Sequence, residues 1–275
     1  MLGSNPESEW FGFRRVNPEE KTGLVHRVFS SVAGNYDLMN DLMSGGLHRL
    51  WKDTLVRRMN PKSGMTILDV AGGTGDVALR LHRRTKGRAK IIVCDINPDM
   101  LEQGKAKALD QGIMSDSAQS RPRAKASNPY GEEQGSSRAN ISWVTGNAEA
   151  LPFPDRSVDL YSIAFGLRNV THIDQALREA ARVLRPGGRF FCMEFSPGVM
   201  PALRPFYESY CVNILPLLGE FVAKDRDAYQ YLAESILKFP PQEELAARVE
   251  KAGLNRAKWT NLTGGIAVIH EGWRL

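Results

Sequence analysis

The 275-residue sequence predicts an α/β fold: a Rossmann-like, mostly parallel sheet of seven strands, with helical caps and a terminal antiparallel hairpin. Two observations support this prediction. Between Thr66 and Glu194, short β-branched runs alternate with helical patterns, which is typical of βαβ units in a parallel sheet. The first of these runs ends in a glycine-rich turn, as in open sheets that bind a ligand at their carboxyl edge.

The elements follow in order along the chain. Five runs are expected to be strands: Thr66–Val70, Lys90–Cys94, Ile141–Thr145, Ser157–Ile163 and Gly188–Glu194. Three segments between them are expected to be helices: Asp76–Arg84, Pro98–Ala108 and Ile173–Leu184. The last of these has its apolar residues at helical spacing. The final hairpin is expected to consist of Leu254–Asn261 and Gly265–His270.

Helical segments flank the predicted sheet. Val25–Met43 and Leu47–Met59 are amphipathic and precede it, and residues 200–252 are helical and interrupted by prolines. We expect residues 200–252 to cap the carboxyl edge of the sheet.

Residues 1–24 are expected to form an N-terminal extension and residues 25–275 a single domain. Residues 110–139 are rich in Ser, Arg, Gly, Gln and Pro and have almost no large apolar side chains. Such a segment cannot bury enough surface to order itself, so we expect a disordered insertion there.

The composition is that of an ordinary globular protein, with 42% hydrophobic and 24% charged residues. The net charge of +5 is spread along the chain, so we expect no nucleic-acid surface, while attraction to an anionic membrane surface stays open. The three cysteines cannot form a disulfide framework, and no His/Cys spacing resembles a zinc site, so no metal is expected. Residues 1–20 resemble neither a secretory signal nor an intact transit peptide.

The turn after the first strand is the main candidate for a ligand site. Asp69 lies near the end of the strand, and Gly73, Thr74 and Gly75 follow before a helix. Glycines let a ligand approach the main chain, and the helix presents free N–H groups to it. This turn also fits the G-x-G-x-x-G/A dinucleotide pattern, so it does not identify the ligand by itself.

Of two neighbouring turns, one suits a dinucleotide and a methyl donor equally and the other favours a methyl donor. Asp95 closes the second strand, where a carboxylate can accept both hydroxyls of an adenosine ribose, in either kind of ligand. Asn147 and Ala148 follow the third strand, where a small polar turn can bond the adenine edge, which favours S-adenosylmethionine. No tyrosine has a lysine four residues later, as a short-chain dehydrogenase would require.

Taken together, several blocks resemble one family, the ubiquinone/menaquinone biosynthesis C-methyltransferases. The resemblance runs from about Phe11 to the C-terminus, interrupted by the insertion. The blocks are Tyr36–Ser44 with His48 and Trp51, Leu68–Asp76, Cys94–Asn97, Asn147–Phe153, Phe165–Val170, Arg182–Gly188, Tyr229–Ser235 and Asn261–Gly265.

The resemblance implies a class I methyltransferase that uses S-adenosylmethionine to methylate a ring carbon of a polyprenylated methoxy-benzoquinol in ubiquinone biosynthesis. It implies that Thr74, Asp95, Asn147 and Ala148 contact the cofactor; Ala164 stands where some members carry a serine. The insertion and the Phe11-Gly12-Phe13 segment resemble the eukaryotic branch. That branch implies the mitochondrial matrix, peripheral on the inner membrane, beside other ubiquinone-synthesis proteins. A bacterial member would instead be cytoplasmic and also methylate demethylmenaquinol.

Two residues are candidates for the ring chemistry. Arg168 is expected to stabilise a phenolate or to hold a water that accepts its proton, because a guanidinium is a poor direct base. His48 is expected to be the general base, since its pKa range suits that task. Each has a structural alternative: Arg168 as a partner of a carboxylate, and His48 as a packed helix residue.

Three further alternatives stay open. The apolar cluster Phe206, Tyr207, Tyr210, Ile214, Leu215, Leu217 and Leu218 either lines a path for the isoprenoid tail, touches the membrane, or packs as core. The chain could instead be a non-catalytic scaffold that holds partner enzymes, and a homodimer is compatible with the sequence.

Overall fold

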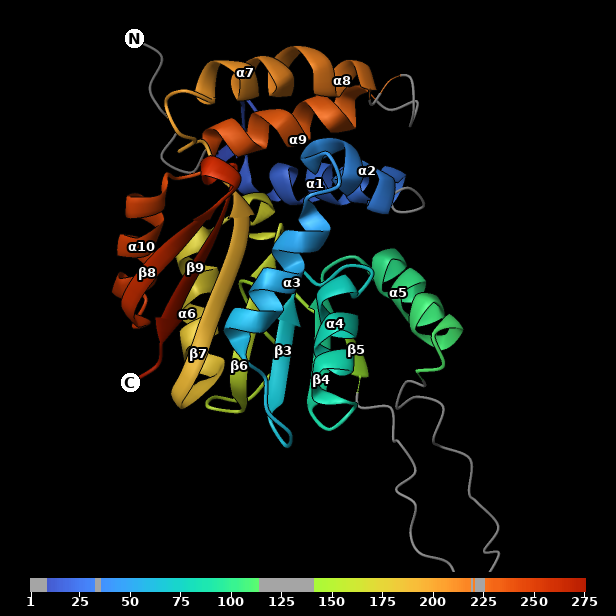
Figure 1. The fold of residues 1–275 in the computed structure, drawn as a ribbon, viewed down its shortest axis with the longest axis vertical. Coiled ribbons are helices and arrows are strands. Elements are labelled where there is room, and N and C mark those ends of the chain that lie inside the picture. Colours follow the sequence, from blue (N-terminus) through green and yellow to red (C-terminus); the bar gives the residue numbers. More distant parts are fainter. Residues whose placement is uncertain (1–8, 33–35, 114–140, 219, 221–225) are drawn as a thin grey trace, which may run out of the picture.

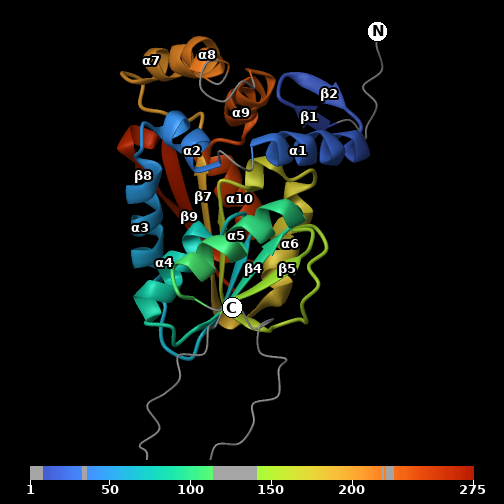
Figure 2. The same ribbon diagram turned by 90° about the vertical axis from the view of Figure 1, so that its right-hand side faces the viewer.

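The computed structural model describes residues 9–32, 36–113, 141–218, 220 and 226–275. Within these residues the chain forms a central sheet with helices on both faces and further helices above one edge (Figures 1 and 2). The expected insertion at residues 110–139 lies outside the described residues from residue 114 onward.

The central sheet has seven strands in the order β5-β4-β3-β6-β7-β9-β8. The first five of these are parallel: β3 (Thr66–Val70), β4 (Lys90–Asp95), β5 (Ile141–Thr145), β6 (Val158–Ala164) and β7 (Leu184–Phe195). All five predicted strands are confirmed. The chain starts in the middle of the sheet, adds β4 and β5 to one side and then crosses to β6, so the switch point lies between β3 and β6.

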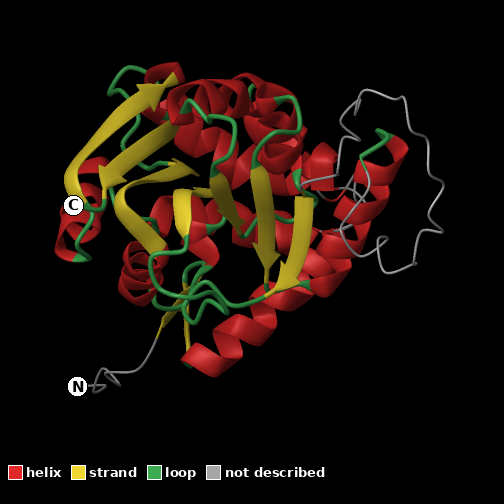
Figure 3. Cartoon of the chain, turned by 90° about the horizontal axis from the view of Figure 1, so that it is seen from below, coloured by secondary structure: helices red, strands yellow, loops and turns green. Residues whose placement is uncertain are grey.

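The last two strands form the predicted antiparallel hairpin. They are β8 (Asn255–Leu262) and β9 (Ala267–Trp273). The final strand, β9, lies between its two antiparallel neighbours β7 and β8. Figure 3 shows the strands in one twisted row with helices on either side.

Each face of the sheet has its own apolar core. One core packs α3 (His48–Met59), α4 (Asp76–Thr85) and α5 (Pro98–Asp110) on side chains such as Ile67 and Ile91. The other packs α6 (Ile173–Val183) and α10 (Gln242–Lys251) on side chains such as Leu68 and Tyr161. Neighbouring residues of a strand point to opposite faces, which explains why Ile67 and Leu68 enter different cores. The predicted helices α4, α5 and α6 are confirmed.

The remaining elements lie over the carboxyl ends of the parallel strands (Figures 1 and 2). They are the hairpin β1 (Glu9–Phe11) and β2 (Arg14–Val16), the helices α1 (Pro18–Val32) and α2 (Tyr36–Ser44), and the later segments α7 (Arg204–Ser209), η4 (Tyr210–Ile214), α8 (Leu215–Leu218) and α9 (Arg226–Lys238). The cap over the edge is therefore built from segments that precede the parallel strands and segments that follow them.

Three predicted boundaries are corrected. The segment predicted as helical from Val25 begins earlier, at Pro18, because proline and two acidic residues suit the first turn of a helix. α1 therefore crosses the boundary expected after residue 24. The predicted segment 200–252 is divided, because its last helix, α10, packs on β8, β9 and α6 rather than over the edge.

Candidate functional site

The turn between β3 and α4 follows a path that glycine allows. Gly73 and Gly75 have φ of 51° and 74°, in the left-handed region. A Cβ atom on Gly75 would lie 2.4 Å from the Trp143 ring, and one on Gly72 would lie 2.7 Å from Val93 Cγ1. The turn is therefore pressed against side chains of β4 and β5, and it leads directly into the first turn of α4.

The carboxylate of Asp95 ends β4 and holds two turns together. Its Oδ2 accepts a hydrogen bond from Gly73 N–H at 2.8 Å, and its Oδ1 accepts one from Asn97 N–H at 2.9 Å. Burial raises the pKa of Asp95. The carboxylate also lines a pocket, where the sequence predicted an acceptor for ribose hydroxyls.

The turn after β5 places a polar edge on the same pocket. Asn147 Oδ1 accepts from Glu149 N–H at 2.9 Å, and Ala148 is buried between them. Glu149 Oε1 in turn accepts from Thr171 N–H at 3.0 Å and from His172 N–H at 3.1 Å. The turns that follow β5 and β6 are thereby tied together at the carboxyl edge.

The pocket encloses about 820 Å³, its open mouth included, and is mostly apolar. An apolar lining with a few polar groups is the character of a small-molecule site. Of the predicted cofactor residues, Gly73, Asp95, Asn147 and Ala148 line it. Phe165 and Gly166, which follow β6, form another wall.

Helix α1 covers this pocket. Its residues Thr22, Val25, His26 and Phe29 line the pocket from above. Two contacts fasten the helix: Lys21 Nζ donates to Val170 O at 3.1 Å, and Thr22 Oγ1 lies 3.2 Å from Thr171 Oγ1. A third joins the far end, where Asn97 Nδ2 donates to Ser30 Oγ at 3.0 Å.

The other two predicted cofactor residues, Asp69 and Thr74, line a smaller cavity that adjoins the same turn. Asp69 Oδ1 accepts from Ser162 Oγ at 2.7 Å, and burial raises the pKa of Asp69 to about 7. Among the described residues, Asp69 Oδ2 and Thr74 Oγ1 are buried without a hydrogen-bond partner. Buried polar atoms are nearly always paired, so these two atoms indicate a ligand or water.

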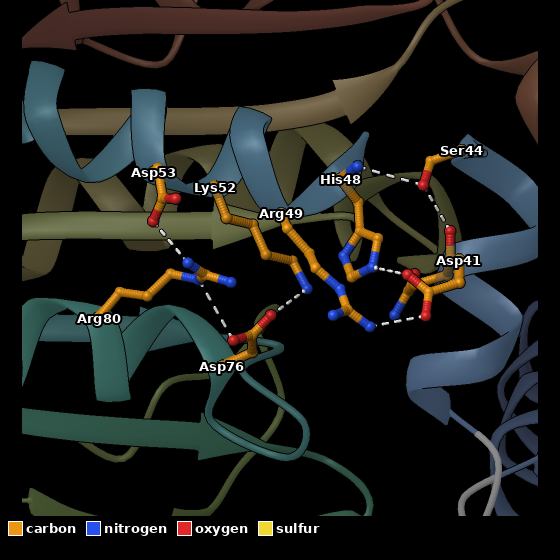
Figure 4. Close-up of polar contacts among 9 residues, drawn as sticks. Asp41, Ser44, His48, Arg49, Lys52, Asp53, Asp76 and Arg80 are labelled. Atoms are coloured by element: carbon orange, nitrogen blue, oxygen red, sulfur yellow. Dashed lines mark hydrogen bonds and ion pairs between the residues drawn. The ribbon is translucent and has the colours of Figure 1, made fainter. Parts of the chain in front are cut away.

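His48 begins α3 and is almost fully buried (Figure 4). Its Nε2 donates to Asp41 Oδ1 at 2.9 Å, and Asp41 Oδ2 accepts from Arg49 Nη2 at 2.7 Å. Burial and the nearby Lys52 charge lower the pKa of His48, so the ring is neutral near pH 7. Among the described residues its Nδ1 has no partner. His48 does not line the pocket.

Arg168 is buried in an ion pair rather than facing the pocket. Its Nη1 lies 2.5 Å from Glu194 Oε1, and both side chains are 1% exposed. The guanidinium also donates to Phe165 O at 2.8 Å and to Ser235 Oγ at 3.3 Å. Arg168 therefore holds the backbone of Phe165, whose side chain forms a wall of the pocket. The predicted contact with a phenolate stays a prediction.

The sequence did not single out Lys21, Lys52 or Glu194, and it did not predict that α1 covers the pocket. Lys52 lies one turn after His48 on an amphipathic helix, and Glu194 ends a strand next to the one that precedes Arg168. Both positions could have been recognised as functional candidates. Lys52 is an ionisable residue within an apolar helical pattern, and Glu194 is a carboxylate at the ligand-binding edge of the sheet.

The chain was compared with known proteins. The model of the ubiE/COQ5 methyltransferase family matches residues 15–274. The chain belongs to the ubiE/COQ5 methyltransferase family. A relative from Paracoccus denitrificans, the ubiquinone/menaquinone biosynthesis C-methyltransferase UbiE, is 47% identical over the full length of both chains.

Two relatives are named 2-methoxy-6-polyprenyl-1,4-benzoquinol methylase and are described as mitochondrial. The protein from Oryza sativa is 47% identical and the one from Homo sapiens 44%; the alignments cover 96% of this chain and 88% and 84% of theirs. The family resemblance seen in the sequence is thereby confirmed.

Solved structures agree on the fold. A methyltransferase from Thermotoga maritima, described as SAM-dependent and as a possible histamine N-methyltransferase, aligns with a TM-score of 0.60 at 17% identity over 91% of this chain and all of that one. A putative methyltransferase from Haloferax volcanii, solved with its Trm112 activator, aligns with a TM-score of 0.57 at 16% identity over 90% and 97%. Both support the predicted class I methyltransferase fold.

The ubiE/COQ5 protein is an S-adenosylmethionine-dependent C-methyltransferase of ubiquinone/menaquinone biosynthesis. The residues present fit this cofactor. The buried carboxylate of Asp95 and the polar turn at Asn147 line one pocket, and the unpaired buried atoms of Asp69 and Thr74 line the adjoining cavity. Among the described residues, no cluster of three or more His, Cys, Asp or Glu is placed to hold a metal. None of the described helices has the length and apolar character to cross a membrane.

Proposed function

We propose that this enzyme methylates a ring carbon of 2-methoxy-6-polyprenyl-1,4-benzoquinol in ubiquinone biosynthesis, in the mitochondrial matrix and peripheral to the inner membrane. The observation that carries the proposal is the similarity, at 47% and 44% identity, to the rice and human methylases of that name. The proposed partners are the polyprenylated quinol and other ubiquinone-synthesis proteins. Under this proposal the methyltransferase domain includes the whole of α1, because Thr22 lines the pocket.

A second candidate function is that of a bacterial, cytoplasmic enzyme that methylates demethylmenaquinol in addition to the benzoquinol. The full-length similarity to the Paracoccus protein favours it, because that relative is named for both quinones. The two candidates share one chemistry and differ in the ring system that the site accepts.

When bound, S-adenosylmethionine supplies an electrophilic methyl group on a sulfonium. Removing a proton from a quinol hydroxyl places negative charge on the ortho carbon, which makes that carbon nucleophilic; loss of the ring proton after attack restores aromaticity. Fixing both reactants in line contributes roughly 7–11 kcal/mol.

His48 has the protonation state that a base requires, but it does not line the pocket in this structure, so the substrate hydroxyl must reach it for this role. Its neutral ring can take up a proton at Nδ1, and the hydrogen bond from Nε2 to Asp41 would stabilise the resulting imidazolium. A positioned base typically contributes about 10²–10⁴-fold to rate. Arg168 positions the Phe165 wall, and any charge that it lends to a phenolate is shared with Glu194.

The helices above the edge suit a substrate with a long apolar tail. Tyr207 and Leu215 of the apolar cluster are buried, whereas Phe206 is 77% exposed and Ile214 and Leu217 are about half exposed. The cluster is thus divided between core packing and a free apolar surface, which supports contact of that surface with the tail or the bilayer.

The test is complementation of a bacterial strain that lacks its own enzyme and makes both quinones. Mass spectrometry of the lipid extract should show ubiquinone restored. Ubiquinone restored without menaquinone supports the benzoquinol methylase, both restored support the dual-substrate enzyme, and neither restored refutes the substrate assignment. An Asp95→Ala variant tests the scaffold alternative, because a scaffold would restore ubiquinone-complex assembly and product levels without cofactor binding.

A further inference from the structure

The smaller cavity beside the glycine turn contains a lysine that no role above explains. Lys52 lies on α3, is 3% exposed and lines this cavity with Asp69, Thr74 and Asp76. The cavity is small and opens at its mouth. It shares Ala71 with the larger pocket, so the two cavities meet at the turn.

The lysine is held in place by a chain of ion pairs (Figure 4). Lys52 Nζ donates to Asp76 Oδ2 at 2.8 Å, and Asp76 Oδ1 lies 3.2 Å from Arg80 Nε. Arg80 Nη1 then lies 2.5 Å from Asp53 Oδ1. Although burial acts in the opposite direction, Lys52 and Arg80 lower the pKa of Asp76 to about 2, so the carboxylate stays ionised.

The four side chains of this ion-pair network carry two positive and two negative charges, and the carboxyl of Asp69 lines the same cavity beside them. The cavity therefore offers both a cation and a carboxyl group to a ligand, which suits a zwitterion better than a bare anion. A lysine ammonium has three N–H donors, and the hydrogen bond to Asp76 uses one of them.

The orphaned atoms complete a zwitterion site. Among the described residues, Thr74 Oγ1 and Asp69 Oδ2 are buried, line this cavity and have no hydrogen-bond partner. Thr74 Oγ1 and the Lys52 ammonium can both donate to a carboxylate, and Asp69 Oδ2 can accept from an ammonium. This combination matches the amino-acid end of S-adenosylmethionine, while Asp95 and Asn147 suit its adenosine end in the larger pocket.

We propose that Lys52, oriented by Asp76, binds the carboxylate of the cofactor's methionine moiety. α3 thereby becomes part of the cofactor site, and its first residue, His48, is one turn away from that anchor. The inference rests on cofactor use and is independent of which quinol is methylated.

The test compares two ligands on two proteins by isothermal titration calorimetry. The ligands are S-adenosylmethionine and decarboxylated S-adenosylmethionine, which lacks only the carboxylate. Wild-type protein should bind the decarboxylated ligand about 10- to 100-fold more weakly, as expected for loss of a hydrogen-bonded charge pair. Lys52→Met should lose this preference, because its affinity for S-adenosylmethionine falls while its affinity for the decarboxylated ligand changes by less than about threefold.

Arg80→Met is the matched control, because Arg80 belongs to the same chain of ion pairs but does not line the cavity; it should keep the ligand preference. Lys52→Gln gives the same comparison should Lys52→Met fail to fold. Equal binding of both ligands by the wild type would overturn the proposal. So would a Lys52 variant that loses affinity for both ligands by the same factor, since the lysine would then only shape the turn.

Discussion

Replacing Glu194 by glutamine should destabilise the protein strongly, because it removes the only negative charge that the structure places against the buried Arg168 guanidinium within hydrogen-bond distance among the described residues. The Glu194 carboxylate accepts three hydrogen bonds: from Arg168 Nη1 at 2.5 Å, from Phe195 N–H at 2.9 Å and from Arg168 N–H at 3.3 Å. Glutamine keeps the shape but offers only one acceptor oxygen, so at least one buried donor loses its partner.

Breaking a fully buried ion pair by removing one member typically costs about 3–5 kcal/mol. Both side chains here are 1% exposed, so screening by solvent does not reduce this value. We therefore expect Glu194→Gln to lower the free energy of unfolding by about 3–5 kcal/mol, and the melting temperature by on the order of 10 °C.

The assay is urea denaturation followed by circular dichroism, on Glu194→Gln, Arg168→Met and the double variant Arg168→Met/Glu194→Gln. The double variant should be more stable than the sum of the single losses predicts, because it leaves no charge unpaired. A loss below about 1 kcal/mol in Glu194→Gln, or strictly additive losses, would refute the reasoning. An Arg168 variant is thus expected to lose activity partly through loss of structure, and its kinetics need the stability measurement beside them.

Three further perturbations have outcomes fixed by the geometry. Gly75→Ala should lower the free energy of unfolding by more than the roughly 1–2 kcal/mol of left-handed strain, because its Cβ would also meet the Trp143 ring at 2.4 Å; urea denaturation measures the loss. Asp69→Asn should flatten the pH dependence of stability. Its folded pKa of about 7 lies above its unfolded value, so the wild type should lose on the order of 4 kcal/mol as pH rises from about 4 to 7, whereas the variant should not, as urea midpoints across that range would show. Asn97→Ala should cost about 1 kcal/mol in the same assay, because Asn97 Oδ1 caps α5 by accepting from Asp99 N–H and Met100 N–H.

Each of these changes has a control. Gly64 also has a positive φ, but a Cβ there would meet nothing within 4 Å, so Gly64→Ala isolates the strain; equal losses at both glycines would contradict the clash. For Asp69→Asn, parallel pH curves for variant and wild type would contradict the raised pKa. Asn97→Ser keeps a neutral side-chain oxygen at the cap and loses the amide hydrogen bond to Ser30, so it should be milder than Asn97→Ala.

The sheet was predictable because its central strands β3, β4 and β6 are largely buried and form short β-branched runs between helices with clear periodicity. Asp95 and Asn147 were predictable for a related reason: residues that directly follow parallel strands meet at one edge, whatever the length of chain between them. For these positions it was enough to recognise the strands from their residue pattern and to know that the carboxyl ends of parallel strands share one edge.

The partners of buried charges were not predictable. Arg168 follows β6 and Glu194 ends the adjacent strand β7, 26 residues later, and a sequence cannot tell whether such an arginine faces a ligand or a carboxylate. The position of α1 over the pocket was missed for a similar reason. Its amphipathic pattern shows that one face is covered, but the hydrogen bonds that fix its place join residues 149 positions apart.

The position of β9 has a consequence for how the protein is made. Its seven residues leave the ribosome after those of β7 and β8, yet they pair with β7 on one side and β8 on the other. Until they emerge, β7 is an open sheet edge and β8 has no neighbour to join, so the nascent chain carries two unpaired strands that invite aggregation. Loss of β9 would therefore leave β7 and β8 without the strand that lies between them in the sheet.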